Sequence, residues 1–378
     1  MAESEIGETT QVLNTTNIRD PSTETVMDFQ KVHTQGCSPL WKIPQELRDM
    51  VYAHLFLDTR LSFGTIKKTR IEITPAKNSL AFLRTCRRAN SEVGDTWLSQ
   101  VLFNFEGAVT MMDKLAALPS SKMSKIRHIR LRGDMVTLYG DRDNFFYSYA
   151  LVSVLKLLPS LNLDTLTVLT EDGDYSEVNR LVLFGQSWKE LRYISRCSSI
   201  LGGPFHFTEH GYWWRRRVQP SHWIGILNSR DGIHSHPSVT IYRSTIPGMA
   251  CAVMCKDTRL QYQQKPPAPG EESEFVERET KALMSEDEVS KELMIVVRRG
   301  NSSEYEQKQD SSPPIYPDIS EHFPGKSWSQ LRGLCFDDWE FCLEDDDWCD
   351  EDFRNKFPAL RREVDVYKHA HDYEWFGF

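Results

Sequence analysis

Long apolar runs, a secretory leader and regularly paired cysteines are all missing from this sequence. No run of about 18 apolar residues is present, so we expect no membrane-spanning helix. The first residues are polar and acidic, without the basic and then apolar pattern of a secretory signal. The eight cysteines are scattered through 378 residues, which is typical of reduced thiols. These features predict a protein of the cytoplasm or nucleus that has no membrane partner.

Motifs of catalysis and metal binding are missing too. The chain contains no Gly-x-Ser-x-Gly, Walker or His-Glu-x-x-His segment. Its closest cysteine pair, Cys251 and Cys255, lacks a second pair, and the spacing of the cysteines at 335, 342 and 349 does not suit structural zinc. An aromatic-rich region holds five histidines to which no motif assigns a role: His206, His210, His222, His234 and His236. We therefore expect no catalytic residue, no bound metal and no cofactor, and we expect that the protein is not an enzyme.

Charge is unevenly distributed along the chain, whose formal net charge is -9. Residues 41–135 are basic, whereas residues 337–352 contain ten acidic residues and no basic one, interrupted by Trp339, Phe341 and Trp348. The basic residues have two interpretations: a nucleic-acid surface, or a solvated face that pairs with the acidic segment. The basic residues in question are Arg84, Arg87, Arg88, Lys122, Lys125, Arg127, Arg130 and Arg132. The acidic chain as a whole favours the second interpretation, so we expect no nucleic-acid partner.

Two helices are expected near the N-terminus. Pro44 suits the start of the first helix, where its missing N–H is not needed. The apolar residues that follow have the i, i+3, i+4 spacing of a single buried stripe. They are Leu47, Met50, Val51 and Leu55, and His54 falls on the same stripe. From spacing alone, a core face is favoured over a docking surface. Ser79 can cap the second helix, which has Arg84, Arg87 and Arg88 on one side.

Three segments farther along repeat one apolar pattern, apolar-x-x-apolar-x-apolar. They are Ile126/Ile129/Leu131, Leu163/Leu166/Val168 and Trp188/Leu191/Tyr193. The second offset suits a leucine-rich repeat, and the first requires an insertion near residues 137–146. Between the first two segments, residues 145–159 are expected to form an apolar helix that ends at Pro159. Such strands would bury their apolar faces by stacking side by side.

The remaining signals divide the chain. Residues 1–36 are predicted to be disordered, 61–74 a short hairpin, 101–105 a strand and 109–118 a helix. We expect a helical module over 37–118, a strand–helix body over 119–260 and a linker over 261–290. A C-terminal section over 291–378 contains a lone buried strand at 293–297, a disordered loop and the acidic segment. The predicted fold class is α+β.

The N-terminal region resembles the F-box-like proteins of filamentous fungi. The resemblance rests on a Leu-Pro-x-Glu-like start that leads into a helix at 40–56, followed by LRTCRRANSEV, VLFNF and IRHIRL. It covers residues 38–135, and more loosely extends to 195. Residues 58–78 lie between the two helices, as an inserted hairpin.

This resemblance implies an adaptor that recruits a substrate protein, still unknown, to a cullin–RING ubiquitin ligase. A Skp-type adaptor would bind one side of the N-terminal helix: Leu40, Ile43, Pro44, Leu47, Met50, Val51 and Leu55. The region after residue 200 would select the substrate. Two alternatives stay open: a scaffold protein with no ligase link, and an enzyme with an unrecognised site among the histidines, Trp213 and Trp214.

Overall fold

The computed structural model divides the chain into two compact units, Met1–Arg48 and Asp49–Phe378. It describes residues 38–66, 71–73, 79–85, 87–140, 145–170, 173, 175–185, 187–202, 205–207, 213–215, 220–263, 283, 285–300 and 318–335. The predicted disordered tail 1–36, the loop within 301–317, most of the linker and the acidic segment 337–352 lie outside these ranges. Of the first unit, the structure describes a short 3-10 helix, η2 (Pro39–Lys42), and the start of helix α1 (Gln45–Leu57).

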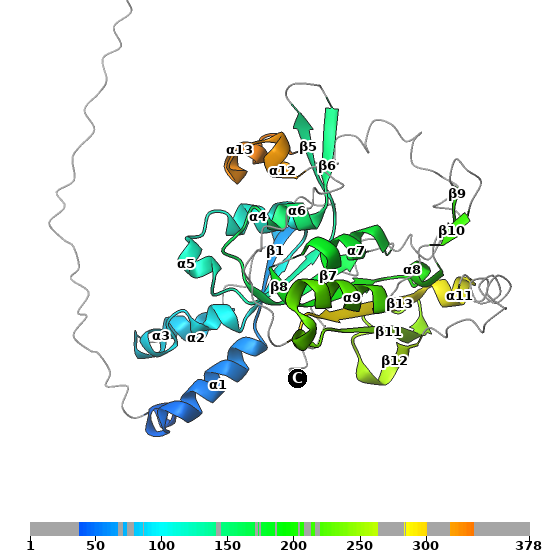
Figure 1. Ribbon diagram of the computed structural model, residues 1–378. Helices are drawn as coiled ribbons and strands as arrows, with labels where there is room; N and C mark the ends of the chain where they lie inside the picture. Colours follow the sequence, from blue (N-terminus) through cyan, green and yellow to red (C-terminus); the bar gives the residue numbers. More distant parts are fainter. Residues whose placement is uncertain are drawn as a thin grey trace, which may run out of the picture. The chain divides into compact units, whose positions relative to one another are not determined.

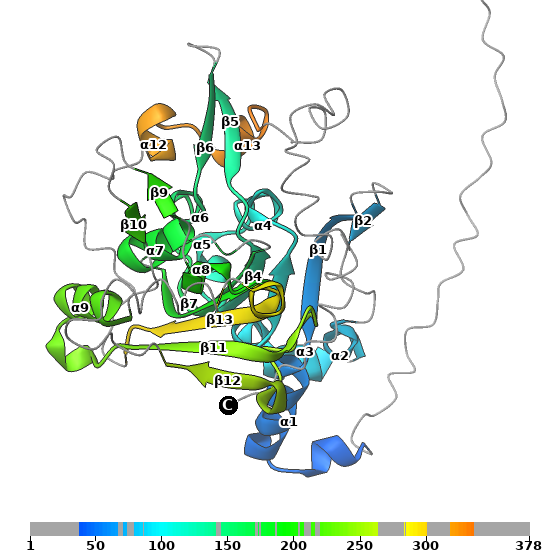
Figure 2. The ribbon, with the colours of Figure 1, turned by 90° about the vertical axis from the view of Figure 1, so that its right-hand side faces the viewer.

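A sheet of nine described strands organises the second unit (Figures 1 and 2). Its order is β12 (Arg259–Tyr262), β11 (Ser238–Pro247), β13 (Lys291–Arg298), β8 (Trp188–Ser195), β7 (Leu163–Thr170), β4 (His128–Arg132), β3 (Leu102–Phe105), β1 (Arg60–Ile66) and β2 (Ile71–Ile73). The strands β1, β3, β4, β7 and β8 are parallel and follow one another in chain order. Strand β2 is antiparallel at one edge, and β13, β11 and β12 are antiparallel at the other. The sheet is therefore mixed, with helices between its strands, as the α+β prediction requires.

Helices connect the parallel strands. Between β1 and β3 lie α2 (Ala81–Thr85), α3 (Arg87–Val93) and η3 (Thr96–Ser99); α4 (Ala108–Leu115) and α5 (Ser120–Met123) precede β4. The hairpin of β5 (Val136–Gly140) and β6 (Phe145–Tyr149) and then α6 (Leu151–Leu155) precede β7, and α7 (Tyr175–Phe184) precedes β8. Figure 1 places α4, α6 and α7 on the same side of the sheet.

Shorter elements complete the described chain. After β8 come α8 (Ser199–Gly202), the pair β9 (Phe205–Phe207) and β10 (Trp213–Arg215), α9 (Pro220–Asp231) and η4 (Ile233–Ser235). The helix η5 (Lys256–Thr258) precedes β12, and α11 (Glu286–Val289) precedes β13. Last come α12 (Ile319–His322) and α13 (Trp328–Arg332). None of the helices described has the length and apolar content needed to cross a bilayer.

The repeated apolar pattern marks the centre of the core. Its nine residues, the three triplets given above, are all fully buried. They also align across the sheet: Ile129 pairs with Leu166, which pairs with Leu191, and Leu131, Val168 and Tyr193 align in the same way. Strand β3 extends these rows, because Phe103 pairs with Ile129. The three patterned segments thus stack side by side, as the sequence predicted.

Other predictions need correction. Residues 145–159 are not one helix, because residues 145–149 form β6 and only Leu151–Leu155 is helical. The predicted lone strand at 293–297 is instead β13, which lies between β8 and β11. The 61–74 segment does contain an antiparallel strand pair, but β1 also pairs with β3 in the large sheet. The expected division at residue 118 therefore falls between neighbouring strands of one sheet.

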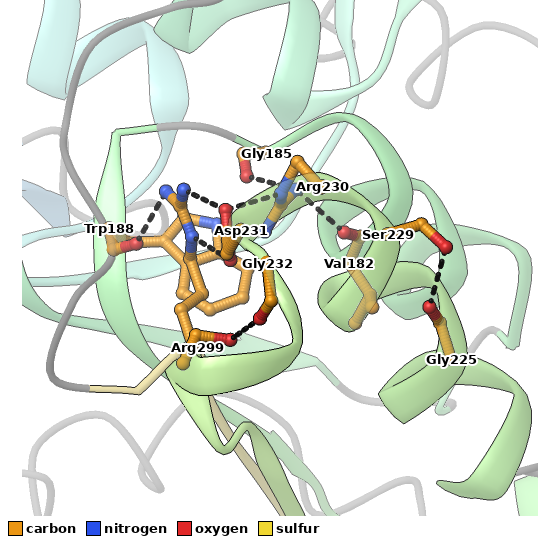
Figure 3. A network of polar contacts seen from close by, with 10 residues as sticks. Val182, Gly185, Trp188, Gly225, Ser229, Arg230, Asp231, Gly232 and Arg299 are labelled. Atoms are coloured by element: carbon orange, nitrogen blue, oxygen red, sulfur yellow. Dashed lines mark hydrogen bonds and ion pairs between the residues drawn. The ribbon is translucent and has the colours of Figure 1, made fainter.

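A buried ion cluster joins the end of β13 to the end of α9 (Figure 3). The Asp231 carboxylate accepts hydrogen bonds from Arg299 Nη2 at 2.6 Å and Nε at 2.9 Å. Arg230 also pairs with Asp231, and its Nη1 donates to the carbonyls of Val182 and Gly185. Burial works to raise the pKa of Asp231, but the hydrogen bonds from Arg299 and the charges of both arginines outweigh it, so the pKa is lowered. Asp231 thus stays ionised and holds β13 beside the parallel strands.

Candidate docking surface

Helix α1 begins directly after Pro44. The Pro44 carbonyl accepts the first helical hydrogen bond, from the Arg48 N–H, and Glu46 in the first turn suits the helix dipole. The Arg48 side chain contacts the residues that precede the helix. Its guanidinium lies 5.6 Å from the centroid of the Trp41 ring and donates a hydrogen bond to the Ile43 carbonyl at 2.7 Å. These contacts fix the turn that leads into α1.

The apolar stripe predicted to be buried faces outward instead. The exposed fractions are 49% for Leu47, 58% for Met50, 48% for Val51 and 43% for Leu55. Because α-helical residues three and four positions apart share a face, these four side chains form a continuous apolar surface, which we call the α1 stripe. The interpretation of this spacing as a core face is therefore wrong.

The buried side of α1 is made by other residues, spaced four apart. Arg48, Tyr52 and Phe56 are only 5%, 4% and 1% exposed. The Tyr52 ring lies 5.1 Å from the Phe82 ring of α2, and the Tyr52 hydroxyl donates to Glu92 of α3 at 3.0 Å. Sequence reasoning missed this bracing face, although two aromatic residues at i and i+4 are a visible signal for it.

The seven residues proposed from the sequence do not all share one face. Leu47, Met50, Val51 and Leu55 lie on the α1 stripe. Leu40 lies in η2 and is half-buried, as is Ile43, whereas Pro44 is exposed. These three precede the α-helix, so helical spacing does not relate them to the stripe.

The basic residues considered as a nucleic-acid surface are spread over different parts of the second unit. Arg88 pairs with Glu92 on α3, and Lys125 pairs with Asp95. Arg127 donates to the Asn162 carbonyl at 2.9 Å. Arg130 is buried in the sheet, where its Nε donates to Asn104 at 2.7 Å. The buried Arg130 therefore does not belong to an exposed basic surface.

The structure describes only some of the candidate chemical residues. His222, His234 and His236 are exposed, and the side chains of His206 and His210 lie outside the described residues, as do those of Trp213 and Trp214. Cys251 and Cys255 are free thiols. Across the described ranges, no cluster of three His, Cys, Asp or Glu residues is arranged to hold a metal ion.

No protein-family model, curated protein or solved structure matches this chain. The interpretation of the α1 stripe therefore rests on the residues and their geometry.

Proposed function

We propose that the chain is an F-box-like adaptor, with the α1 stripe as the surface that binds a Skp-type adaptor protein. The observation that carries this proposal is the outward position of four apolar side chains on a helix that is braced from behind. Fully burying one such side chain is worth roughly 1.5–3 kcal/mol, and exposed apolar patches mark interaction sites. A protein partner that covers the stripe would gain this free energy.

The bracing residues give the stripe a second property of a docking site. Tyr52 contacts both α2 and α3, and Phe56 is buried on the same side of α1, so the outward face is presented on a helix that is supported from behind. A helix that is already ordered loses little conformational entropy on binding. This arrangement, a first helix supported by the helices that follow residue 79, is in keeping with the F-box resemblance.

The region after residue 200 is the proposed substrate-selecting part, and the parallel strands of the second unit precede it in the chain. They stack in chain order with a helix in most connections, which is the arrangement that a degenerate leucine-rich body would have. Docking of the α1 stripe does not depend on the chemistry of the substrate protein, so adaptor binding and substrate selection can be tested separately.

A binding assay with purified proteins tests the proposal. Immobilised full-length chain is incubated with a purified Skp-type adaptor, using the wild type and the double variant M50D/L55D. The matched control is L260D, because Leu260 on β12 is an equally apolar side chain that is 64% exposed. We expect the wild type and L260D to retain the adaptor and M50D/L55D to lose it. No retention by the wild type would reject the ligase role.

The same stripe also favours a second candidate, a scaffold protein that uses α1 to associate with itself or with another protein. Self-association predicts a dimer in sedimentation experiments that M50D/L55D dissociates and L260D does not. A monomeric wild type that retains the Skp-type adaptor would decide against this candidate.

A further inference from the structure

A histidine lies within the α1 stripe. His54 follows Met50 by four positions and Val51 by three, and helical residues at these spacings share a face. Its side chain is exposed, as are those of Met50, Val51 and the adjoining Leu55. The apolar surface proposed for docking therefore contains a side chain whose charge depends on pH.

Asp58 is the charged residue that follows His54 on the same side of α1. It lies four positions later and is exposed, and its backbone N–H donates to the His54 carbonyl at 3.3 Å. A carboxylate at this spacing attracts a protonated histidine only weakly, because water screens an exposed pair. His54 also lies in the last turn of α1, where the helix dipole favours a positive charge. In the free chain, a protonated ring is thus stabilised mainly by solvent.

The helices that support α1 contact its other side. The Tyr52 ring meets Phe82 of α2, and the Tyr52 hydroxyl donates to Glu92 of α3. Glu92 is the charged group that α3 brings to α1, and it already pairs with Arg88 at 2.9 Å. Tyr52 is two positions before His54, so the two side chains leave the helix about 200° apart. The charges of α3 that contact α1 therefore do so on the side opposite His54.

A partner that covers the stripe would remove the water around His54. Burial in an apolar setting disfavours the charged form of a histidine and tolerates the neutral ring. The helix places Met50 and Val51 beside the ring, so the covered surface there is apolar. Histidine is also the side chain that ordinarily changes charge between pH 5 and 8. Docking at this surface and protonation of the ring should therefore oppose each other.

We propose that protonation of His54 weakens docking of the α1 stripe, so that the partner is held near neutral pH and released in mild acid. This inference rests on the proposed function, because it concerns the same surface and the same Skp-type adaptor. A partner that accepts only the neutral ring binds about fourfold more weakly at pH 6.0 than at pH 7.5, for an ordinary histidine pKa of about 6.5.

Affinity measurements at two pH values test the proposal. Binding of purified Skp-type adaptor to the full-length chain is titrated at pH 7.5 and pH 6.0 for the wild type, H54Q, H54K and H222Q. The matched control is H222Q, because His222 is an exposed histidine on another helix, α9. Titratable groups of the adaptor affect all four chains alike, so the quantity compared is the change in Kd between the two pH values.

We expect the wild type and H222Q to lose about four times more affinity than H54Q on going to pH 6.0. H54K carries a positive charge at both pH values, so it should bind about tenfold or more weakly than the wild type at pH 7.5. A pH change in the wild type that equals that of H54Q, a gain in wild-type affinity at pH 6.0, or an unweakened H54K would overturn this inference and leave the adaptor proposal intact. Absence of binding by the wild type and H54Q at both pH values would instead reject the adaptor proposal, and this inference with it.

Discussion

Replacing Asp231 by asparagine tests the buried ion cluster that fixes β13 in the sheet. The substitution keeps the shape of the side chain but removes its charge, and the amide nitrogen cannot accept the hydrogen bonds that Arg299 and Arg230 donate. The side chains of Asp231 and Arg299 are only 3% and 5% exposed, so water does not replace the lost partner. Removing one member of a buried ion pair costs about 3–5 kcal/mol.

The expected loss is large compared with the stability of a folded domain, which is about 5–15 kcal/mol. We expect D231N to lower the melting temperature by about 5–10 °C in calorimetry. The control D257N changes an exposed aspartate and should stay within about 0.5 kcal/mol of the wild type. A loss below about 1 kcal/mol in D231N would refute the view that this cluster holds β13 in place.

The lowered pKa of Asp231 adds a pH dependence with a defined sign. A carboxyl whose folded-state pKa lies below its unfolded value contributes stability that is fully present above about pH 4 and is lost as the pH falls through the folded value. The stability difference between the wild type and D231N should therefore be constant near neutral pH and shrink only in strong acid. Denaturant titrations at several pH values measure it.

Three further predictions concern single contacts. In a urea titration, G300A should cost more than about 2 kcal/mol, because Gly300 has a φ of 95° and an added Cβ would clash with the Ser235 carbonyl oxygen. The control G232A should cost less, because Gly232 has a similar φ of 92° but an added Cβ there would meet nothing within 4 Å. Y52F should cost about 1–2 kcal/mol by removing the hydrogen bond to Glu92, whereas M50S on the exposed side of α1 should be within about 0.5 kcal/mol of the wild type; equal effects would contradict the assigned faces. Burial raises the pKa of Glu292, so its contribution to stability is present below about pH 4 and is lost as the pH rises through the folded value; E292Q should remove this decline from a stability–pH profile.

The core of the sheet could be predicted from the sequence because it depends on local periodicity. The positions of Ile129, Leu166 and Leu191 follow from the repeated apolar spacing, and stacking such strands buries all three. The pairing of β13 with β8 joins segments about a hundred residues apart, and no local pattern encodes it. The strand β6 was missed because apolar aromatic residues such as Phe146 occur in strands and helices alike.

The orientation of α1 shows a different limit of sequence reasoning. Spacing identified Leu47, Met50, Val51 and Leu55 as one apolar face, and they do share a face. The helix has a second apolar face, however, with Tyr52 and Phe56, and spacing does not decide which of the two meets the core. The contacts with Phe82 and Glu92 decide it, and they depend on the tertiary packing of α2 and α3.

The central claim is that the α1 stripe is a protein-docking surface, and hydrogen–deuterium exchange tests it most directly. Exchange is measured on the full-length chain alone and with an excess of purified Skp-type adaptor. The account predicts new protection over residues 45–57 in the wild type, which M50D/L55D abolishes and L260D retains. Protection that appears only outside α1, or no protection at all, would contradict it.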